Sequence, residues 1–277
     1  MMRYWRRVRT EKHPVRFLLS RLFWKTGLST WFLIRKEDYL LRFYPSALSA
    51  TLWLDPRDRL ADEVFLRSYL RPGDVMLDVG ANIGHLSVLS SRVVGDTGKV
   101  VAVEAHPKTF KYLQGNVALN GAKNVNAYNV ALGNEDGSIF FSDVKSDDQN
   151  AIVLNSSGIR VPLRRLDDIP IIDPCVNLMK IDVEGYEKFV LEGAAATLNK
   201  TRCIYFESWA SHFARYSYVC RDLYELLLGK GFQIYKLEGQ RLSPISADYV
   251  SEQCENLVAI RDFEEFWLRT GAQIQHG

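Results

Sequence analysis

The sequence predicts an α/β fold, in which helices cover both faces of a mostly parallel β-sheet. Three observations support this expectation. Apolar segments of strand length alternate with amphipathic segments of helix length from residue 75 onward, as parallel strands joined by crossover helices do. A glycine-containing turn, DVGANIG at 78–84, joins the first of these strands to its helix. Acidic residues end several strands, at the edge where open α/β sheets bind their ligands.

Charge divides the chain into two parts. The 277 residues carry a formal net charge of +2, but residues 1–36 contain ten Lys or Arg and one acid, so the remainder is net acidic. Such a basic segment can bind an anionic partner or the protein's own acidic surface. We therefore expect a basic, helical N-terminal extension at 1–56, followed by one folded domain at 57–277.

Residues 14–34 have apolar side chains at helical spacing, which predicts one or two amphipathic helices. The apolar stripe consists of Phe17, Leu18, Leu22, Phe23 and Trp24, with Arg16, Arg21 and Lys25 beside it. It either packs on the protein's own body or docks on a membrane surface. No recognition module for nucleic acid accompanies it, so we do not expect a nucleic-acid partner.

The sequence also indicates where the protein resides. Charged residues interrupt each long apolar run and no cleavage motif follows, so we expect neither a transmembrane helix nor a signal peptide. The four cysteines lack the short spacing of zinc or redox sites, which favours small buried side chains in a reducing compartment. We therefore expect a cytoplasmic protein, with peripheral membrane contact through residues 1–36 as an open alternative.

The elements follow from apolar spacing and turn residues. Residues 39–54 have an extended pattern, residues 57–70 a helical one, and Pro72-Gly73-Asp74 forms a turn. The alternating region then consists of strands at 75–80, 99–104, 125–132, 176–182 and 203–208 and helices at 83–94, 107–120, 186–199 and 217–230. Strands at 232–237 and 256–261 close the chain, and turn-separated apolar segments within 137–165 predict a β-hairpin insertion.

The glycine turn is suited to a nucleotide-like cofactor. Gly80 permits a tight turn, and Gly84 allows the helix to pack closely on the strand. The helix N-terminus offers free N–H groups beside Asp78, Ala81 and Asn82. Alternatively, the motif is only a structural turn.

Glu104 supplies a partner for such a cofactor. It ends the second strand, where an acid can accept hydrogen bonds from ribose hydroxyls. A dinucleotide would prefer glycine at position 82, where its pyrophosphate crowds the backbone, whereas S-adenosylmethionine has no phosphate. Asn82 therefore favours S-adenosylmethionine, and a nucleotide-linked oxidoreductase remains the alternative.

The segment LMKIDVEGYE at 178–187 brings further carboxylates to the same edge. Asp182 and Glu184 follow an apolar strand, and Glu207 ends the next one. These acids either cap the helix that begins near Tyr186 or face a ligand. Gly185 favours a ligand, because it allows a sharp turn that leaves room beside the backbone.

DVGANIG, VEAHP, Leu166-Asp167-Asp168 and KIDVEGYE followed by LEGA together resemble the FkbM family of S-adenosylmethionine-dependent methyltransferases, over roughly residues 71–210. The resemblance implies a class I methyltransferase (Rossmann-like) fold of seven strands, the last antiparallel. It also implies O-methylation, usually of a hydroxyl on a sugar, lipid or secondary metabolite, so the expected partner is a small-molecule, glycan or lipid acceptor. The extension and the region after 210 match no element of the family and would select the acceptor.

Methyl transfer to an alcohol needs a base or a metal. Asp182 is the first candidate, as base or as partner of the cofactor's ammonium group, and Glu184 and Glu207 follow. Ala131 would flank the adenine. Mg²⁺ would relieve the repulsion among these carboxylates, and catechol-type O-methyltransferases hold metal after the strands that here end in Asp182 and Glu207.

Other roles stay open at this point. His212 is either the base or a surface histidine, and Lys180 either neutralises a carboxylate or contacts the acceptor. The whole protein could also be a non-catalytic one that keeps the fold and binds a membrane through residues 1–36.

Overall fold

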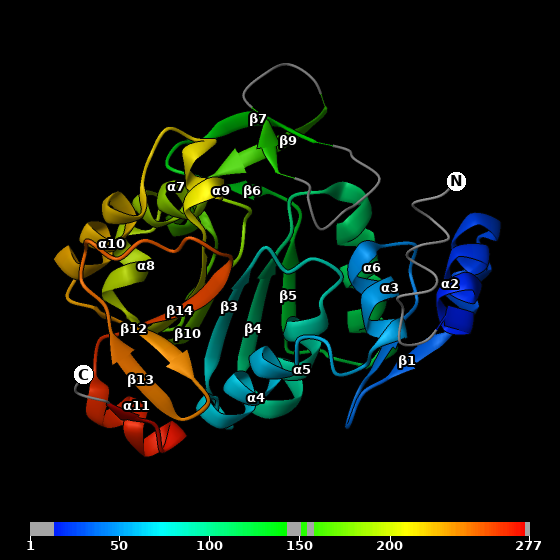
Figure 1. The fold of residues 1–277 in the computed structure, drawn as a ribbon, viewed down its shortest axis with the longest axis horizontal. Helices are drawn as coiled ribbons and strands as arrows, with labels where there is room; N and C mark the ends of the chain where they lie inside the picture. Colours follow the sequence, from blue (N-terminus) through cyan, green and yellow to red (C-terminus); the bar gives the residue numbers. More distant parts are fainter. Residues whose placement is uncertain (1–13, 143–150, 154–157, 275–277) are drawn as a thin grey trace.

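The computed structural model describes residues 14–142, 151–153 and 158–274. Its centre is a nine-stranded sheet of order β15-β13-β12-β14-β11-β10-β3-β4-β5 (Figure 1). The parallel strands are β3 (Val75–Val79), β4 (Lys99–Val103), β5 (Val125–Tyr128), β10 (Val176–Ile181) and β11 (Thr201–Ser208). Next to them, β14 (Glu255–Ile260) runs antiparallel to both β11 and β12 (Gln233–Glu238). The expected mostly parallel sheet with an antiparallel last strand is confirmed for these seven strands.

The expected total of seven strands is wrong, because two more strands extend one edge. The chain reverses after β12 and forms β13 (Arg241–Pro244), which pairs with it antiparallel. The C-terminal β15 (Gln273–Ile274) then adds to β13 in parallel.

Helices cover both faces of this sheet, as the alternating pattern predicts. On one face lie α4 (Leu60–Tyr69), α5 (His85–Val94), α6 (Pro107–Leu119) and α11 (Phe263–Thr270), and on the other lie α7 (Glu187–Glu192), α8 (Ala195–Asn199) and α10 (Cys220–Gly229). Alternate residues of a strand enter opposite cores: Met76 packs with the first set, whereas Leu77 and Val79 pack with the second.

The helix expected at 186–199 is divided at Gly193. A Cβ at this glycine would lie 1.9 Å from the carbonyl oxygen of Gly133, so a residue with a side chain does not fit at this break. The Asp167 carboxylate, in the 3₁₀ turn η3 (Leu166–Asp168), accepts from the backbone N–H groups of Ala196 and Thr197, both at 2.8 Å. These bonds satisfy the start of α8.

The extension is only partly helical. It forms α2 (Pro14–Thr26), a 3₁₀ turn η1 (Leu28–Trp31), the antiparallel pair β1 (Leu33–Arg35) and β2 (Leu40–Arg42), and α3 (Ala47–Leu54). The extended pattern expected through residue 54 is wrong beyond β2, because Ser46 accepts from the N–H of Ser49 and starts α3.

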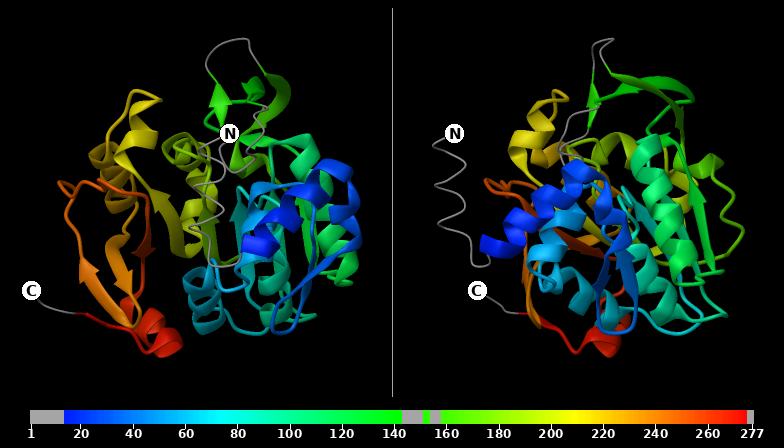
Figure 2. Two further views of the ribbon diagram at one scale, coloured as in Figure 1. Left: turned by 45° about the vertical axis from the view of Figure 1, so that its right-hand side comes forward. Right: turned by 90° about the vertical axis from the view of Figure 1, so that its right-hand side faces the viewer.

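The extension shares the core of the main domain. Ile34, Leu41 and Leu52 are buried together with Phe65 and Leu89. Figure 2 shows the extension, in blue, packed against the outer side of the sheet's helices. The boundary at residue 56 therefore marks a change in charge along the chain. As a boundary between domains it stays a prediction.

The β-hairpin expected within 137–165 is present as consecutive antiparallel strands, but it is part of a larger, four-stranded sheet. Its strands are β6 (Ala131–Leu132), β7 (Gly137–Phe141), β8 (Ile152–Val153) and β9 (Ile159–Arg164), in the order β6-β9-β7-β8. β6 comes from the segment expected to be the end of a longer strand, 125–132. Outside the insertion, the short helix α9 (Ala210–Ala214) directly follows β11. No helix within the described residues has both the length and the apolar character needed to cross a bilayer.

Candidate active site

A cavity lies at the carboxyl ends of β3, β4, β10 and β11, beneath the small sheet and α3. Every residue that the sequence predicted for cofactor binding or catalysis lines it, except Gly84: they are Asp78, Gly80, Ala81, Asn82, Glu104, Ala131, Asp182, Glu184 and Glu207. The parallel topology accounts for this convergence, because it brings the carboxyl ends of neighbouring strands to one edge.

The glycine turn is held by tight packing. Gly80 has a φ of 78°, and a Cβ on it would lie 1.8 Å from the carbonyl oxygen of Asp182. The close approach therefore joins the turn to the end of β10. Gly84 lies outside the cavity lining, and a Cβ there would meet Leu113 of α6 at 2.4 Å. The packing role of Gly84 agrees with the structure, whereas its contact with a cofactor stays a prediction.

Glu104 is fixed by two backbone donors. Its Oε2 accepts from the N–H of Asn82 at 2.9 Å and its Oε1 from the N–H of His106 at 2.8 Å. Burial raises the pKa of Glu104 to about 7, although these two bonds and Lys180 favour the ionised form. Each carboxylate oxygen can accept a second hydrogen bond, so the group is suited to bind hydroxyls from the cavity.

Asp78 and Lys180 form a buried ionic centre under the turn. Asp78 is fully buried, and its Oδ2 accepts from the hydroxyl of Ser87. Its Oδ1 has no hydrogen-bond partner among the described residues; Lys180 Nζ lies 3.6 Å away. Lys180 Nζ also lies 3.4 Å from Asp182 Oδ2 and donates to the carbonyl of Gly80 at 3.1 Å. Although burial opposes it, attraction by Asp182 and Asp78 raises the pKa of Lys180, so the lysine stays charged and neutralises carboxylates.

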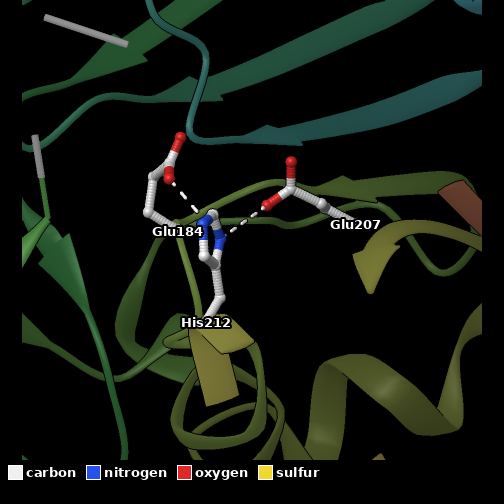
Figure 3. A group of neighbouring side chains, drawn as sticks. All are labelled: Glu184, Glu207 and His212. Atoms are coloured by element: carbon white, nitrogen blue, oxygen red, sulfur yellow. Dashed lines mark hydrogen bonds and ion pairs between the residues drawn. The ribbon is translucent and has the colours of Figure 1, made fainter. Parts of the chain in front are cut away.

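Glu184, Glu207 and His212 form a second cluster (Figure 3), and its two glutamates line the same cavity. His212 Nδ1 lies 3.2 Å from Glu207 Oε2 and 3.5 Å from Glu184 Oε2. Burial, together with Glu207 and Asp182, raises the pKa of Glu184 to about 8. Despite burial, bonds from His212 and Cys254 lower the pKa of Glu207. The surface position considered for His212 is wrong, because its side chain is buried behind the two glutamates.

The turn after β10 agrees with one interpretation of the sequence, because Asp182 and Glu184 line the cavity, but not with the capping interpretation. Neither Asp182 nor Glu184 caps α7; instead Glu187 accepts from the N–H groups of Val183 and Gly185, at 3.0 and 3.3 Å. Gly185 leaves no room for a ligand, because a Cβ there would lie 2.6 Å from the carbonyl oxygen of His212. The glycine lets the turn pack against α9, and this packing aims Glu184 at the cavity.

Part of the lining was missed in the sequence. Leu48 and Thr51 of α3 and Arg59, which begins α4, close the cavity from the extension side. Asp62 also faces it and accepts from the hydroxyl of Tyr205 at 2.6 Å. Tyr205 precedes Glu207 by two residues in β11 and therefore shares its face, which is a signal that strand periodicity contains. No comparable sequence signal identifies the other four residues, Leu48, Thr51, Arg59 and Asp62.

Comparison with known protein families gives a match over the region that contains this site. The sequence model of the methyltransferase FkbM domain matches residues 78–234, which are more than half of the chain and include β4, β5, β10 and β11. The chain belongs to the FkbM methyltransferase family. The match includes the Asp78–Lys180 centre and the Glu184–Glu207–His212 cluster, and it ends in β12.

Two curated relatives match parts of the chain. Methyltransferase 1 of Beauveria bassiana (strain ARSEF 2860) is 30% identical over 144 residues, which are 43% of this chain and 57% of that protein. A tRNA(Phe) (4-demethylwyosine(37)-C(7)) aminocarboxypropyltransferase of Pyrococcus horikoshii is 39% identical over 70 residues, 25% of this chain and 24% of that protein. The chain thus spans about half of the first relative and a quarter of the second.

Solved structures resemble the FkbM domain at low identity. The methyltransferase FkbM from Methylobacillus flagellatus KT is 16% identical, with a TM-score of 0.44 over 90% of this chain and 59% of that one. A SAM-dependent methyltransferase from Aquifex aeolicus is 17% identical, with a TM-score of 0.43 over 75% of this chain and 90% of that one.

Proposed function

We propose that the protein is an S-adenosylmethionine-dependent methyltransferase that methylates a hydroxyl oxygen of a sugar, lipid or secondary metabolite. The charge of the cavity lining supports this proposal most directly. Six acids face the cavity, Asp62, Asp78, Glu104, Asp182, Glu184 and Glu207, against two basic side chains, Arg59 and Lys180. Burial raises the pKa of Glu184 to about 8 and that of Glu104 to about 7, so these two are only partly ionised at neutral pH, but the remaining acids still outnumber the two basic side chains. Such a lining attracts a cationic sulfonium cofactor and repels the pyrophosphate of a dinucleotide, so it counts against the oxidoreductase alternative.

The residues present fit the proposed cofactor. Asp78 Oδ1 is a buried acceptor with no hydrogen-bond partner among the described residues, which suits an ammonium donor. Glu104 offers its carboxylate to ribose hydroxyls, and Ala131, Leu132 and Phe141 give an apolar wall for adenine. When bound, the cofactor supplies a methyl group on a cationic sulfur.

The residues at the ends of β10 and β11 would prepare the acceptor. Asp182 lines the cavity beside Lys180 and is our candidate for receiving the hydroxyl proton. Arg59, with Leu48 and Thr51, lies on the side of the extension and would contact the acceptor. The family assignment and the lining charge support this division of roles.

The decisive experiment is methyl transfer from labelled S-adenosylmethionine into a cell extract, followed by identification of the labelled product. We expect label in a methyl ether or ester and saturable binding of S-adenosylhomocysteine, but not of NAD⁺, by calorimetry. Binding of NAD⁺ in preference to S-adenosylhomocysteine would refute the proposal. Label on nitrogen or carbon would refute O-methylation alone.

We further propose that the outer face of the extension contacts an anionic membrane. Figure 1 shows α2 at the outer edge of the molecule, beyond α3. Of the predicted stripe, Phe17 is buried and packs on the protein, but Leu22 is 54% exposed, and Trp31 after it is 82% exposed. Arg16, Arg21, Lys25 and Arg35 are exposed in the same segment, and no acid occurs between Lys12 and Lys36. Apolar side chains flanked only by cations match a surface of anionic lipid.

Vesicle flotation tests the membrane contact. We expect the full chain to float with vesicles of phosphatidylcholine and phosphatidylserine, and weakly with phosphatidylcholine alone. Trp31→Ser combined with Leu22→Ser should abolish flotation, whereas Ile172→Ser, at a site 91% exposed on another part of the surface, should not. Equal flotation of the double variant and the wild type would dismiss this surface.

A further inference from the structure

The Glu184–Glu207–His212 cluster joins three elements. Glu184 lies in the turn after β10, Glu207 near the end of β11, and His212 in α9. One potential ligand atom of each lies within 4.8 Å of the others, and Figure 3 shows the two carboxylates on either side of the imidazole ring. Glu184 and Glu207 also line the cavity, so the cluster borders the space where the acceptor would bind.

The separations match those between neighbouring ligands of a metal ion. Ligand atoms about 2.1 Å from a divalent ion lie roughly 3.0–3.4 Å apart in octahedral or tetrahedral geometry. The two measured separations, 3.2 Å and 3.5 Å from His212 Nδ1, fall near this range. Small side-chain rotations would bring all three atoms to one ion.

The metal-free cluster leaves its hydrogen bonding incomplete. His212 Nδ1 can carry one proton at most, and two carboxylate oxygens lie within 3.5 Å of it. Among the described residues, neither Glu184 nor Glu207 forms an ion pair with Lys or Arg. Glu207 has a second donor, Cys254 Sγ at 2.9 Å, but Glu184 has none besides His212 among the contacts described. A divalent ion bound between the two carboxyl groups would offset both their burial and their mutual repulsion.

We propose that Glu184, Glu207 and His212 bind a divalent first-row transition metal, of the class Mn²⁺, Fe²⁺, Co²⁺ or Zn²⁺. An imidazole ligand favours these ions over Mg²⁺, which prefers oxygen. The site therefore differs from the Mg²⁺ site expected at Asp182 and Glu207, because His212 and Glu184 replace Asp182. Three protein ligands leave open positions for water or substrate on the side of the cavity.

The role of the metal in catalysis rests on the proposed function, whereas its binding does not. A hydroxyl bound at an open position has a lowered pKa and loses its proton more readily. The proton would pass to the Asp182 carboxylate while the O–C bond forms and the C–S bond breaks, with neutral S-adenosylhomocysteine leaving. The metal changes no oxidation state in this step.

Metal binding can be measured without cofactor or acceptor. Tag-free protein is treated with chelator, dialysed and titrated with Mn²⁺ or Zn²⁺ by calorimetry, with Mg²⁺ for comparison and Mn²⁺ also followed by electron paramagnetic resonance. We expect one ion per chain and much weaker binding of Mg²⁺. Glu184→Gln, Glu207→Gln and His212→Gln should each lower Mn²⁺ affinity at least about tenfold. Glu192→Gln, on the neighbouring helix α7, is the matched control and should bind as the wild type does.

The outcomes separate this site from the proposed function. Absence of saturable Mn²⁺ or Zn²⁺ binding in the wild type, or unchanged affinity in Glu184→Gln, would overturn the metal site. Thermal melting would show whether His212→Gln unfolds. In that case Glu184→Gln tests the metal site, because the Glu184 side chain is partly exposed and Gln has the same shape. S-adenosylhomocysteine binding is measured on the same samples. Its loss with metal binding intact would overturn the methyltransferase proposal and leave the metal site standing.

Discussion

Cofactor affinity should rise with pH through neutrality, because Glu104 must be ionised to accept two ribose hydroxyls. Burial raises the pKa of Glu104 to about 7 in the free protein. Its carboxylate is then about one-tenth ionised at pH 6 and about nine-tenths ionised at pH 8. If only the ionised form accepts both hydroxyls, the dissociation constant should fall roughly tenfold between these values, or about 1.3 kcal/mol.

The sign of the effect is fixed by the direction of the shift. Bound hydroxyls stabilise the carboxylate, so binding lowers the pKa of Glu104 and releases a proton near pH 6–7. Calorimetry of S-adenosylhomocysteine at pH 6, 7 and 8, in buffers of different ionisation enthalpy, measures both the affinity and the released proton. Burial also raises the pKa of Glu187 to about 8, so other groups titrate in this range.

Glu104→Gln isolates the contribution of this residue. The variant cannot ionise, so it should lose most of the pH dependence while other titrations remain. At pH 8 it should also bind about 1.5–3 kcal/mol more weakly, the range for a hydrogen bond to a charged group. A wild-type affinity that is flat or falls from pH 6 to 8, or equal slopes in both proteins, would refute the ribose role.

Three further substitutions test other parts of the site. Asp182→Asn should lower methyl transfer at least about 100-fold with the fold and S-adenosylhomocysteine affinity preserved, and near-normal turnover would remove Asp182 as the base. Gly80→Ala should cost roughly 2–4 kcal/mol in urea unfolding, because its Cβ would lie 1.8 Å from the Asp182 carbonyl oxygen; an unchanged midpoint would contradict this packing. Asp167→Ala should cost about 1–3 kcal/mol by removing two acceptors from the start of α8, and thermal melting within one degree of the wild type would speak against that capping.

Local sequence pattern predicted the sheet and the convergence of carboxylates, but not the contacts between distant segments. The strand ending at Ile181 is mostly apolar and buried, apart from the half-buried Asn177, and strand direction alone carries Asp182 to the same edge as Asp78. The roles of Gly185 and His212 were predicted wrongly because the two residues pack against each other, and this contact joins distant segments of the chain. A loop glycine gives no sign in the sequence that a helix 27 residues later will pack against it.

The extension shows the same limit in another form. Its strand and helix, β2 and α3, could not be separated by apolar pattern, because Ser46 decides the change through a single capping bond. Asn116 of α6 and Asn120, which caps its C-terminus, then accept from the backbone of β2 at 2.8 and 2.9 Å, and these contacts join residues more than seventy positions apart. No pattern within either segment predicts them.

The position of α3 connects the two surfaces that would select an acceptor. On its inner side, Leu48 and Thr51 line the cavity. On its outer side, α3 packs against α2, whose remaining face presents exposed apolar and basic side chains. A membrane-bound acceptor would therefore approach the cavity past α2 and α3. A soluble acceptor would leave the exposed Leu22 and Trp31 without a function in acceptor binding. If the proposed membrane contact is found, we expect a lipid or a lipid-linked sugar among the three proposed classes of acceptor.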